Sequence, residues 1–410
     1  MAEWASPRLK IMTRIPLILS FLLSSTPIAF GQQEGEVVGW GRDDYSQVSN
    51  IPGGTDFVQL TGGGYHSLAL KLDGSIASWG RDNYGQVSNT PTSGVFTQIA
   101  GGCGQHSLAV HANGSVFAWG QDNTGQVSNA PSGSDFIQVA GGYYHSLALR
   151  FSGSIASWGN DAFSQVSNTP STSDFTQIAG GAQHSLALKS NGSIVSWGAN
   201  ASGQVSNTPS GNDFVQIDGG GLHSIALRTN GSIVSWGSDA HGQVSGTPTG
   251  TNFIQVSGGY YHSLALKSDG SIVSWGRNNY RQIIDTPNGS NFTQIAGGNY
   301  QSFSLKVNDA NLSVTNLVSG QAALVEVTNA TPNNYSHFAW SIHGGGPIST
   351  PFGDAMLTPP YHLNLLQTDV NGYASYTANI PLHAAGVTVW CHGTDVGTQS
   401  MLNALMLVIQ

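Results

Sequence analysis

The clearest pattern in the chain is a pair of alternating runs at residues 262–276, which read HSLALKSDGSIVSWG. Successive side chains of a strand point to opposite faces, so each run has two distinct faces. Between the runs, Asp269-Gly270 is typical of a type I′ turn, in which both central residues need a positive φ. The pattern therefore predicts a two-residue β-hairpin in which Ser268 faces Ser271.

That register assigns every side chain of the hairpin to a face. Going outward from the turn, the expected pairs are Lys267 with Ile272, Leu266 with Val273, Ala265 with Ser274, and Leu264 with Trp275. One face then carries Leu264, Leu266, Val273 and Trp275, and the other carries Ser263, Ala265, Lys267, Ile272 and Ser274. One large apolar face and one mostly small face suit a sheet packed on both sides, with large residues of one copy against small residues of the next.

The hairpin is one copy of a repeat. A Trp-Gly pair recurs at Trp40, Trp79, Trp119, Trp158, Trp197, Trp236 and Trp275. A GG-x-x-His-Ser segment recurs around His66, His106, His145, His184, His223 and His262, with Gln301 in the seventh place. The spacing is 39 residues, apart from one step of 40 residues at Cys103-Gly104-Gln105. Repeats of this length are typical of stacked or radial architectures.

The ends of the array indicate how it closes. Each repeat has three strand-like runs and then a connection whose Pro and Asn make it a poor fourth strand. The array begins with a lone third run at residues 36–40 and ends with first and second runs at residues 292–295 and 302–306. An open solenoid would want polar caps at these ends, whereas pairing the ends closes a ring. We therefore predict an all-β chain containing a seven-bladed β-propeller.

The repeat GGYYHSLALKSDGSIVSWG at residues 258–276 resembles that of the regulator of chromosome condensation family, whose fold is a seven-bladed propeller. The resemblance covers about 270 residues. In repeat length, and in the pattern WGRDNYGQ at residues 79–86, the chain is closer to the secreted bacterial propellers that inhibit β-lactamases. Kelch and WD40 repeats fit less well, because the Trp precedes Gly rather than Asp and the period is short for kelch.

The period ends at about residue 307, and a different pattern follows. Short alternating runs occupy residues 312–314, 323–327, 337–342, 373–380, 387–391 and 402–409, with turn signals such as Asn371-Gly372 between them. About 100 residues of this kind indicate a small β-sandwich. We expect three parts: a signal peptide at residues 1–31, the propeller at residues 32–307, and a C-terminal β-sandwich-like domain at residues 308–410.

The N-terminus has the order of a secretory leader. Three basic residues precede an apolar run at residues 15–30, and Ala29-Phe30-Gly31 is a small-x-small cleavage signal. A membrane anchor is the alternative, but the run is short and is broken by prolines and serines. Either Met1 or Met12 could be the start. We expect a secreted or extracytoplasmic protein without a membrane segment after cleavage.

The net charge and the two cysteines bear on the expected partner and on disulfide bonding. Without residues 1–31 the chain has 10 basic and 21 acidic residues, a net charge of −11, which argues against a nucleic-acid partner. Cys103 and Cys391 lie in different expected domains, and two unpaired thiols are favoured over a bridge.

No segment carries a catalytic or metal-binding constellation, such as a nucleophile elbow, H-E-x-x-H or a phosphate loop. The histidine of each repeat is best explained by a repeated hydrogen bond that fixes the loop before the second run. Gln301 supports this, because Gln can replace a hydrogen-bonding His but is a poor metal ligand. The Gly-Gly pairs indicate backbones that crowd near an axis. We expect no enzyme, no cofactor and no metal.

Strand parity places the variable loops on one face. The loop before each His and the segment after each Trp-Gly emerge at the same end of a blade, opposite the Asp-Gly turns. That face carries Tyr45, Tyr65, Tyr84, Tyr143, Tyr144, Phe163, Leu222, His241, Tyr260, Tyr261, Tyr280 and Tyr300. The opposite face carries a ring of Lys71, Arg150, Lys189, Arg228, Lys267 and Lys306. Tyrosine is a frequent interface anchor, so we predict a protein-binding surface.

Two functional hypotheses follow. The first is a non-catalytic secreted module whose aromatic loop face recognises an extracellular or periplasmic protein. The resemblance to β-lactamase-inhibiting propellers implies, more narrowly, a cell-wall or β-lactamase-like enzyme as the partner. The second is a structural or surface-display protein of the cell envelope with the propeller as a rigid scaffold. The sequence leaves the partner's identity, the role of the C-terminal domain and the oligomeric state open.

Overall fold

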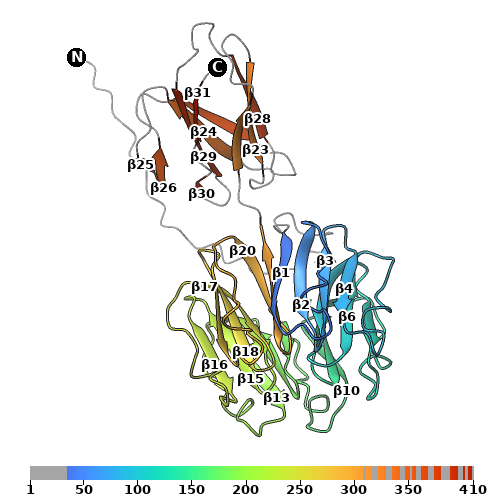
Figure 1. Ribbon diagram of the computed structural model, residues 1–410. Helices are drawn as coiled ribbons and strands as arrows, with labels where there is room; N and C mark the ends of the chain where they lie inside the picture. The colour runs from blue at the N-terminus through green and yellow to red at the C-terminus, as the bar shows by residue number, and fades with distance from the viewer. Residues whose placement is uncertain are drawn as a thin grey trace, which may run out of the picture.

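The structure, a computed structural model, describes residues 35–307 and, beyond them, the backbone of ten strands between residues 311 and 408 (Figure 1). The expected leader at residues 1–31 lies outside the described residues. Every regular element in the described part is a strand. Among these residues no helix is long and apolar enough to cross a membrane.

Residues 36–306 form seven three-stranded antiparallel sheets, which confirms the all-β, seven-bladed propeller. Blade 1 contains β2 (Phe57–Gly62), β3 (His66–Lys71) and β4 (Ile76–Gly80), and blade 2 contains β5 (Phe96–Gly101), β6 (His106–His111) and β7 (Val116–Gly120). Blade 3 contains β8 (Phe136–Gly141), β9 (His145–Arg150) and β10 (Ile155–Gly159), and blade 4 contains β11 (Phe175–Gly180), β12 (His184–Lys189) and β13 (Ile194–Gly198). Blade 5 contains β14 (Phe214–Gly219), β15 (His223–Arg228) and β16 (Ile233–Gly237), and blade 6 contains β17 (Phe253–Gly258), β18 (His262–Lys267) and β19 (Ile272–Gly276).

Blade 7 closes the ring from both ends of the repeat region. It contains β20 (Phe292–Gly297), β21 (Gln301–Lys306) and β1 (Glu36–Gly41), in the order β1-β21-β20. The register runs without a break from Glu36 opposite Lys306 to Gly41 opposite Gln301. Figure 1 shows blue β1 and orange β20 in this shared blade. The predicted closure is therefore confirmed. The connection between blades contains no fourth strand, as its Pro and Asn predicted.

The predicted hairpin register is wrong by one residue. Leu266 pairs with Ile272, not with Val273. The turn is a three-residue loop between Lys267 and Ser271, and the Lys267 N–H donates to the Ser271 carbonyl at 2.9 Å. Of the two turn residues only Gly270 has a positive φ, of 78°. Asp269 uses its carboxylate instead, accepting bonds from the backbone and hydroxyl of Ser271 at 2.9 and 2.7 Å. A local side-chain bond therefore selects a longer turn than the type I′ pattern predicted.

The shift also corrects the predicted faces. Trp275 pairs with Ser263 and shares its face with Ala265 and Val273, not with the two leucines. In the core this face packs against Ile225 and Leu227 of blade 5. The opposite face, with Leu264, Leu266 and Ile272, packs against Phe292, Ile295 and Trp40 of blade 7. At the junction with blade 5 the small Ala265 lies among large residues, as expected, but at the junction with blade 7 large side chains meet from both sides. Each buried Leu or Ile contributes about 1.5–3 kcal/mol to this packing.

The C-terminal strands form two larger sheets and a separate hairpin. β22 (Asn311–Thr315), β23 (Ala322–Thr328) and β28 (Ala374–Asn379) make one sheet. The other contains β24 (Tyr335–Ser341), β27 (His362–Gln367), β29 (Thr388–Asp395), β30 (Ser400–Met401) and β31 (Leu405–Val408). The hairpin pairs β25 (Pro347–Thr350) with β26 (Gly353–Met356). All six predicted runs overlap these strands, and the β-sandwich itself stays a prediction.

Candidate functional site

The junctions between blades form the scaffold on which the variable loops stand. In six of them the His that begins the second strand of one blade bonds the Ser at the second position of the equivalent strand in the next blade. These Nε2···Oγ distances are 2.8–3.0 Å, from His66–Ser107 to His262–Ser302. The predicted structural role is confirmed, but the partner is the neighbouring blade rather than the histidine's own loop.

Burial keeps these histidines neutral. All six are fully buried. The loss of solvation lowers the pKa of His145 to about 3 and that of His262 to about 4, and the other four lie in the same range. At the seventh junction Gln301 donates from Nε2 to the Gly63 carbonyl at 3.0 Å. Gln therefore replaces the hydrogen-bonding His there, as the sequence predicted.

The Gly-Gly pair before each His has a separate steric reason at each position. A Cβ on the first glycine, for example Gly141, would lie 2.5 Å from the Gly102 Cα of the neighbouring blade. A Cβ on the second, Gly142, would lie 2.1 Å from the ring of His145. The first glycine therefore allows blades to approach near the axis, and the second makes room for the junction histidine.

A channel of about 210 Å³ runs along the axis, lined by the inner strand of every blade. One glutamine per blade bridges to the next inner strand: Gln138, for example, accepts from the Ile178 N–H at 2.9 Å and donates to its carbonyl at 3.1 Å. Cys103 and Asp218 also border the channel. Burial, with Asp218 nearby, raises the pKa of the Cys103 thiol to about 12, so this thiol is not an activated nucleophile.

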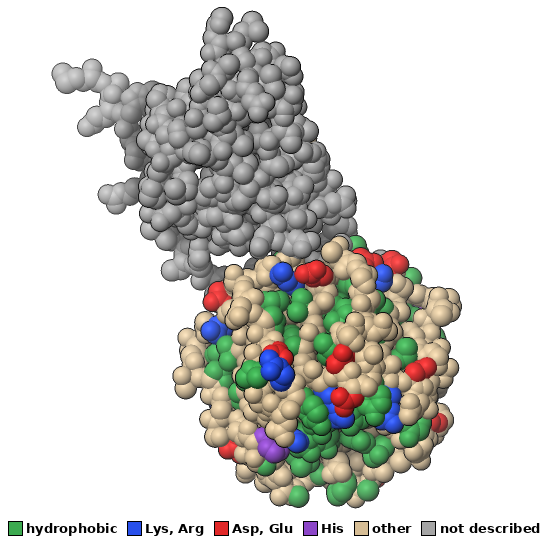
Figure 2. Space-filling view, viewed as in Figure 1, with side chains coloured by type: hydrophobic (Ala, Val, Ile, Leu, Met, Phe, Trp, Pro, Cys, Tyr) green, Lys and Arg blue, Asp and Glu red, His purple; other side chains and the backbone are tan. Residues whose placement is uncertain are grey.

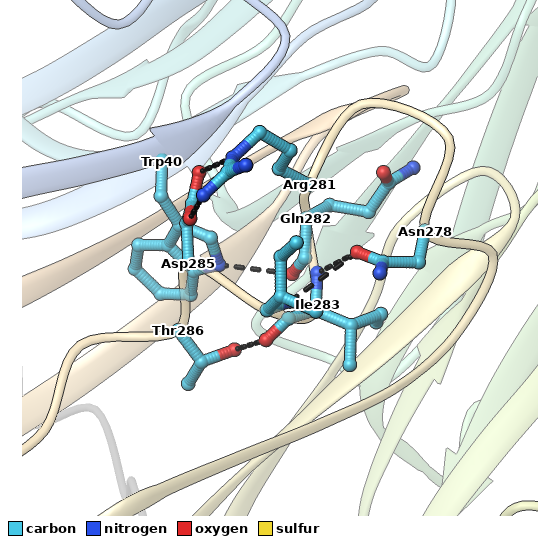
Figure 3. A network of polar contacts seen from close by, with 8 residues as sticks. Trp40, Asn278, Arg281, Gln282, Ile283, Asp285 and Thr286 are labelled. Atoms are coloured by element: carbon cyan, nitrogen blue, oxygen red, sulfur yellow. Dashed lines mark hydrogen bonds and ion pairs between the residues drawn. The ribbon is translucent and has the colours of Figure 1, made fainter.

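The segment after each Trp-Gly is a rigid loop tied to the next blade. Figure 3 shows the copy that follows β19, in which Gln282 accepts at its carbonyl from Trp40 Nε1 at 3.0 Å. Asn278 accepts from the Ile283 N–H at 2.9 Å, and the Thr286 hydroxyl donates to the Ile283 carbonyl at 2.7 Å. The Trp-to-Gln bond recurs in all seven copies at 2.8–3.1 Å. The loop backbone is therefore fixed while its side chains vary.

The two loops of each blade converge on one face, as strand parity predicted. We call this surface, formed by the loops before the His positions and after the Trp-Gly pairs, the loop face. The ring centroids of Tyr45, which follows β1, and Tyr65, which precedes β3, are 5.4 Å apart. Those of Tyr280, which follows β19, and Tyr300, which precedes β21, are 5.1 Å apart. In both pairs a residue after the Trp-Gly of one blade meets the residue before the second strand of the next.

Nine of the twelve predicted residues are brought into aromatic contact. The ring pairs are Tyr45–Tyr65, Tyr143–Tyr144, Tyr143–Tyr260, His241–Tyr261, Tyr260–Tyr261, Tyr261–Tyr300 and Tyr280–Tyr300, with centroids 4.5–6.2 Å apart. Tyr143 and Tyr260, from blades 3 and 6, meet 6.2 Å apart, and Tyr260 lines the channel. The remaining three stand apart: Tyr84 and Phe163 are exposed, and Leu222 is half-buried.

The opposite surface, the turn face, holds its charges in local pairs. The second-strand cations there bond carboxylates of their own blade in Lys71–Asp56, Arg150–Asp135, Lys189–Asp174, Arg228–Asp213 and Lys306–Glu36. Arg150 and Arg228 also lie over Phe136 and Phe214 at 4.3 and 4.5 Å. The turn-face ring of cations is therefore largely engaged within each blade.

Sequence reasoning missed one group of residues on the loop face. Arg42, Arg81 and Arg277 occupy the second position after Trp in three copies and stack on the tyrosines. A comparison of the repeats at this position could have found them, because the second residue after Trp varies from copy to copy. Among the described residues no group of His, Cys, Asp and Glu could hold a metal ion.

The repeat is recognised independently. Six segments match the family profile of the regulator of chromosome condensation (RCC1) repeat, at residues 57–86, 96–126, 136–165, 175–204, 214–243 and 253–282. The chain is an RCC1-like repeat propeller. The seventh, split copy lies outside these matches. No curated protein matches the chain.

Solved structures share the fold of this RCC1-like propeller. Prp20p from Saccharomyces cerevisiae, described with its binding to Gsp1p and histones, has 19% identity and a TM-score of 0.58 over 68% of this chain and 93% of its own. Yeast RCC1 (Prp20) bound to Kap60 has 18% identity and a TM-score of 0.57, over 75% and 97%. The ectodomain of the receptor kinase CR4 from Physcomitrella patens has 21% identity and a TM-score of 0.51, over 62% and 74%.

Proposed function

We propose that this chain is a non-catalytic, secreted protein-binding module whose loop face recognises an extracellular or periplasmic protein. The observation that carries the proposal is the convergence of two variable loops per blade onto one aromatic surface, above a scaffold that repeats in every blade. Rigid tyrosines offer large contact area at low conformational cost, and such residues anchor many protein interfaces.

The fold is used for protein binding elsewhere. Prp20p is described with Gsp1p and histones, and yeast RCC1 was solved with Kap60. These proteins are less than 25% identical to this chain, so their partners do not transfer. An RCC1-like propeller also forms part of a receptor-kinase ectodomain, which supports the use of this fold outside the cell.

Export rests on the leader at residues 1–31, with its basic, apolar and small-residue segments in order. We expect cleavage after Gly31. Intact-mass measurement of the protein recovered from the periplasm or medium would test this. A mature protein that retains residues 15–30 would remove the basis for an extracytoplasmic partner.

The partner we propose is a cell-wall or β-lactamase-like enzyme. It follows from repeat length and from the WGRDNYGQ pattern, which resemble the β-lactamase-inhibiting propellers. A purified serine β-lactamase and a cell-wall transpeptidase can therefore be assayed directly for binding and inhibition. The competing role, a rigid scaffold of the envelope, would leave both enzymes unbound and the loop face unnecessary.

The deciding experiment replaces Tyr143, Tyr144, Tyr260 and Tyr261 together with Ala. The mature protein, residues 32–410, first captures partners from periplasmic and secreted proteins, and affinity is then measured for each captured protein. We expect at least a ~100-fold loss, since a few anchors of this type usually dominate an interface. The matched control replaces Leu72 and Phe151, which are exposed on the turn face, with Ala.

The variant's fold is checked by its melting temperature. Unchanged affinity in the tyrosine variant would exclude the loop face as the site. Collapse of the fold would mean that the tyrosines serve only to pack neighbouring loops. Equal loss in the turn-face control would place binding elsewhere on the propeller.

A further inference from the structure

Arginine occurs at the second position after Trp only in three consecutive blades. Arg277, Arg42 and Arg81 follow β19, β1 and β4, the outer strands of blades 6, 7 and 1. The other four blades carry Gln121, Asn160, Ala199 and Ser238 at the same position. The chain has only 13 basic residues in 410, so three at equivalent positions in adjacent blades give the loop face a distinct sector.

The scaffold beneath this sector is the same as elsewhere. The backbone N–H groups of Arg42, Arg81 and Arg277 each donate to the carbonyl of the residue before the second strand of their own blade at 2.9 Å. Gln121 and Asn160 make the same bond at 2.8 Å. The sector therefore differs from the other blades in its side chains and not in its backbone.

Arginines and tyrosines alternate across the sector. The guanidinium carbon of Arg277 lies 5.0 and 5.7 Å from the ring centroids of Tyr261 and Tyr300. Arg42 lies over Tyr300 and Tyr65 at 5.4 and 5.1 Å, and over Tyr280 at 4.7 Å. Arg81 lies over Tyr65 and Tyr45 at 5.5 and 4.8 Å. We call this set the arginine–tyrosine row. Stacking holds the planar guanidinium groups in place and leaves their N–H edges for other partners.

Two of the three arginines have no carboxylate partner among the described residues. Arg42 is paired with Asp44 at 2.6 Å, but neither Arg81 nor Arg277 forms an ion pair within residues 35–307. Arg81 faces the neutral amide of Asn83. The Nε of Arg277 is buried without any hydrogen-bond partner in the described part of the chain.

The nearby acids are already occupied. Asp82 accepts from the backbone N–H groups of Val87 and Ser88 at 2.8 and 2.9 Å, and Asp43 does the same in its own loop. They fix the loops rather than neutralise the arginines. The one side of the propeller that Figure 2 shows is mostly neutral, with charges of both signs scattered over it. Unpaired, stacked guanidinium groups are thus a local exception in a chain of net charge −9.

From these observations we infer that the arginine–tyrosine row binds an acidic loop of the partner protein, with its carboxylates against Arg81 and Arg277 and its apolar atoms against the tyrosines. The inference rests on the proposed function and names the chemistry of the partner. Guanidinium and carboxylate groups form paired, charge-assisted hydrogen bonds. The net negative charge of the rest of the chain would repel the same loop elsewhere, so the row also fixes its orientation.

The test uses two capped pentapeptides, Ac-Gly-Glu-Tyr-Glu-Gly-NH2 and the same peptide with Gln in place of Glu. Each is titrated into the mature chain while the arginine Nε–H resonances are followed by NMR. We expect the Glu peptide to bind at least ~10-fold more tightly, to shift the resonances of Arg81 and Arg277, and to weaken with added salt. Equal binding of the two peptides, or binding of neither, would overturn the inference.

Matched variants separate charge from fold. Arg81→Gln with Arg277→Gln introduces the residue that blade 2 carries naturally at Gln121, so the loop backbone is expected to remain intact. This double variant should lose the preference for the Glu peptide, and Arg81→Lys with Arg277→Lys should keep part of it. A short oligothymidine that binds the row more tightly than the Glu peptide would assign it to nucleic acid instead.

The captured partner distinguishes the two proposals. If the four-tyrosine variant loses the partner and the double arginine variant keeps it unchanged, the proposed function stands and the acidic-loop inference is wrong. If both variants retain the partner, both are wrong. Loss of the partner in both, with melting temperatures unchanged, supports the two together.

Discussion

The blade junctions and the loop face are built from the same repeats but vary in opposite ways. At the junctions the Trp, His and inner-strand Gln recur almost without change. The bond from each Trp to a Gln carbonyl, for example, keeps a length of 2.8–3.1 Å in all seven copies. On the loop face, the side chains five residues after Trp range from Tyr84 to Ser202, on loops that all carry the same Trp-to-Gln bond. Conservation of the backbone with variation of the side chains is the arrangement that a recognition surface requires.

The seventh junction departs from the other six in one respect. Gln301 replaces His, bonds the Gly63 carbonyl and leaves the Ser67 hydroxyl buried without a partner among the described residues. The ring nevertheless closes, with a full ladder between β1 and β21 inside blade 7. Closure therefore does not require a His–Ser bond at every junction.

The largest effect should come from breaking that closure. Deletion of residues 36–40 exposes the edge of β21 and removes Trp40, which is 4% exposed, from the core with Leu264 and Phe292. We expect the propeller to unfold or to oligomerise through the free edge. Calorimetry and size-exclusion chromatography with light scattering would detect either. A monomer with unchanged melting would show that the split blade is dispensable.

The junction histidines predict a steep loss of stability in acid. Their folded pKa values, about 3 to 4, lie below the unfolded value of 6.5, so the neutral form favours folding. The stability that these neutral histidines contribute is then fully present above about pH 6.5. It is lost as the pH falls, because the unfolded chain binds close to six more protons than the folded one. The unfolding free energy should fall by ~8 kcal/mol per pH unit near pH 5, which is enough to unfold a typical domain there.

Urea unfolding at several pH values between 5 and 8 measures this slope, and His145→Gln provides the control. Gln is tolerated at the equivalent position in blade 7, so the variant should fold and should lower the slope by about 1.4 kcal/mol per pH unit, one proton's share. A nearly flat profile down to pH 5 would mean that the histidines are not buried as neutral groups.

A paired substitution compares the two regions directly within blade 3. Trp158 is 5% exposed and packs with Leu108 and Phe136, whereas Phe163, five residues later on the loop face, is 46% exposed. Trp158→Ala should cost about 3–5 kcal/mol of unfolding free energy, and Phe163→Ala about 0.5 kcal/mol or less. Denaturant midpoints of the two variants would check this, and similar costs would contradict the separation of scaffold from surface.

The sequence predicted the blades because Trp-Gly and GG-x-x-His recur at a fixed spacing, and strand parity then located the loop face. It failed where a local bond decides between two turns, as in the Asp269–Ser271 contact that sets the hairpin register. It also missed the partner of each histidine, because the bond joins residues of different copies about 40 positions apart. The arginine–tyrosine row was missed because the second position after Trp was not compared among the repeats.

The smallest effect concerns Asp218, the one carboxylate among the described residues that line the axial channel. Asp218 stands where blades 2, 3, 4 and 7 have Ala100, Ala140, Ala179 and Ala296. It accepts from the Gly219 and Gly258 N–H groups at 2.8 and 2.9 Å and from the Ser257 hydroxyl at 3.0 Å. Its side chain borders the channel but is surrounded by protein elsewhere. Burial outweighs these bonds and raises the pKa of Asp218 to about 6.

A raised pKa means that the folded state favours the protonated acid, so Asp218 weakens the fold as the pH rises from about 4 to 6. Asp218→Ala introduces the residue that four other blades carry. Its unfolding free energy, relative to that of the wild type, should therefore rise by about 1 kcal/mol between pH 5 and pH 7. Because the histidine slope is common to both proteins, the difference between their urea midpoints isolates this one group. A difference that is constant with pH would show that the carboxylate is ionised throughout, held by its three donors against the cost of burial.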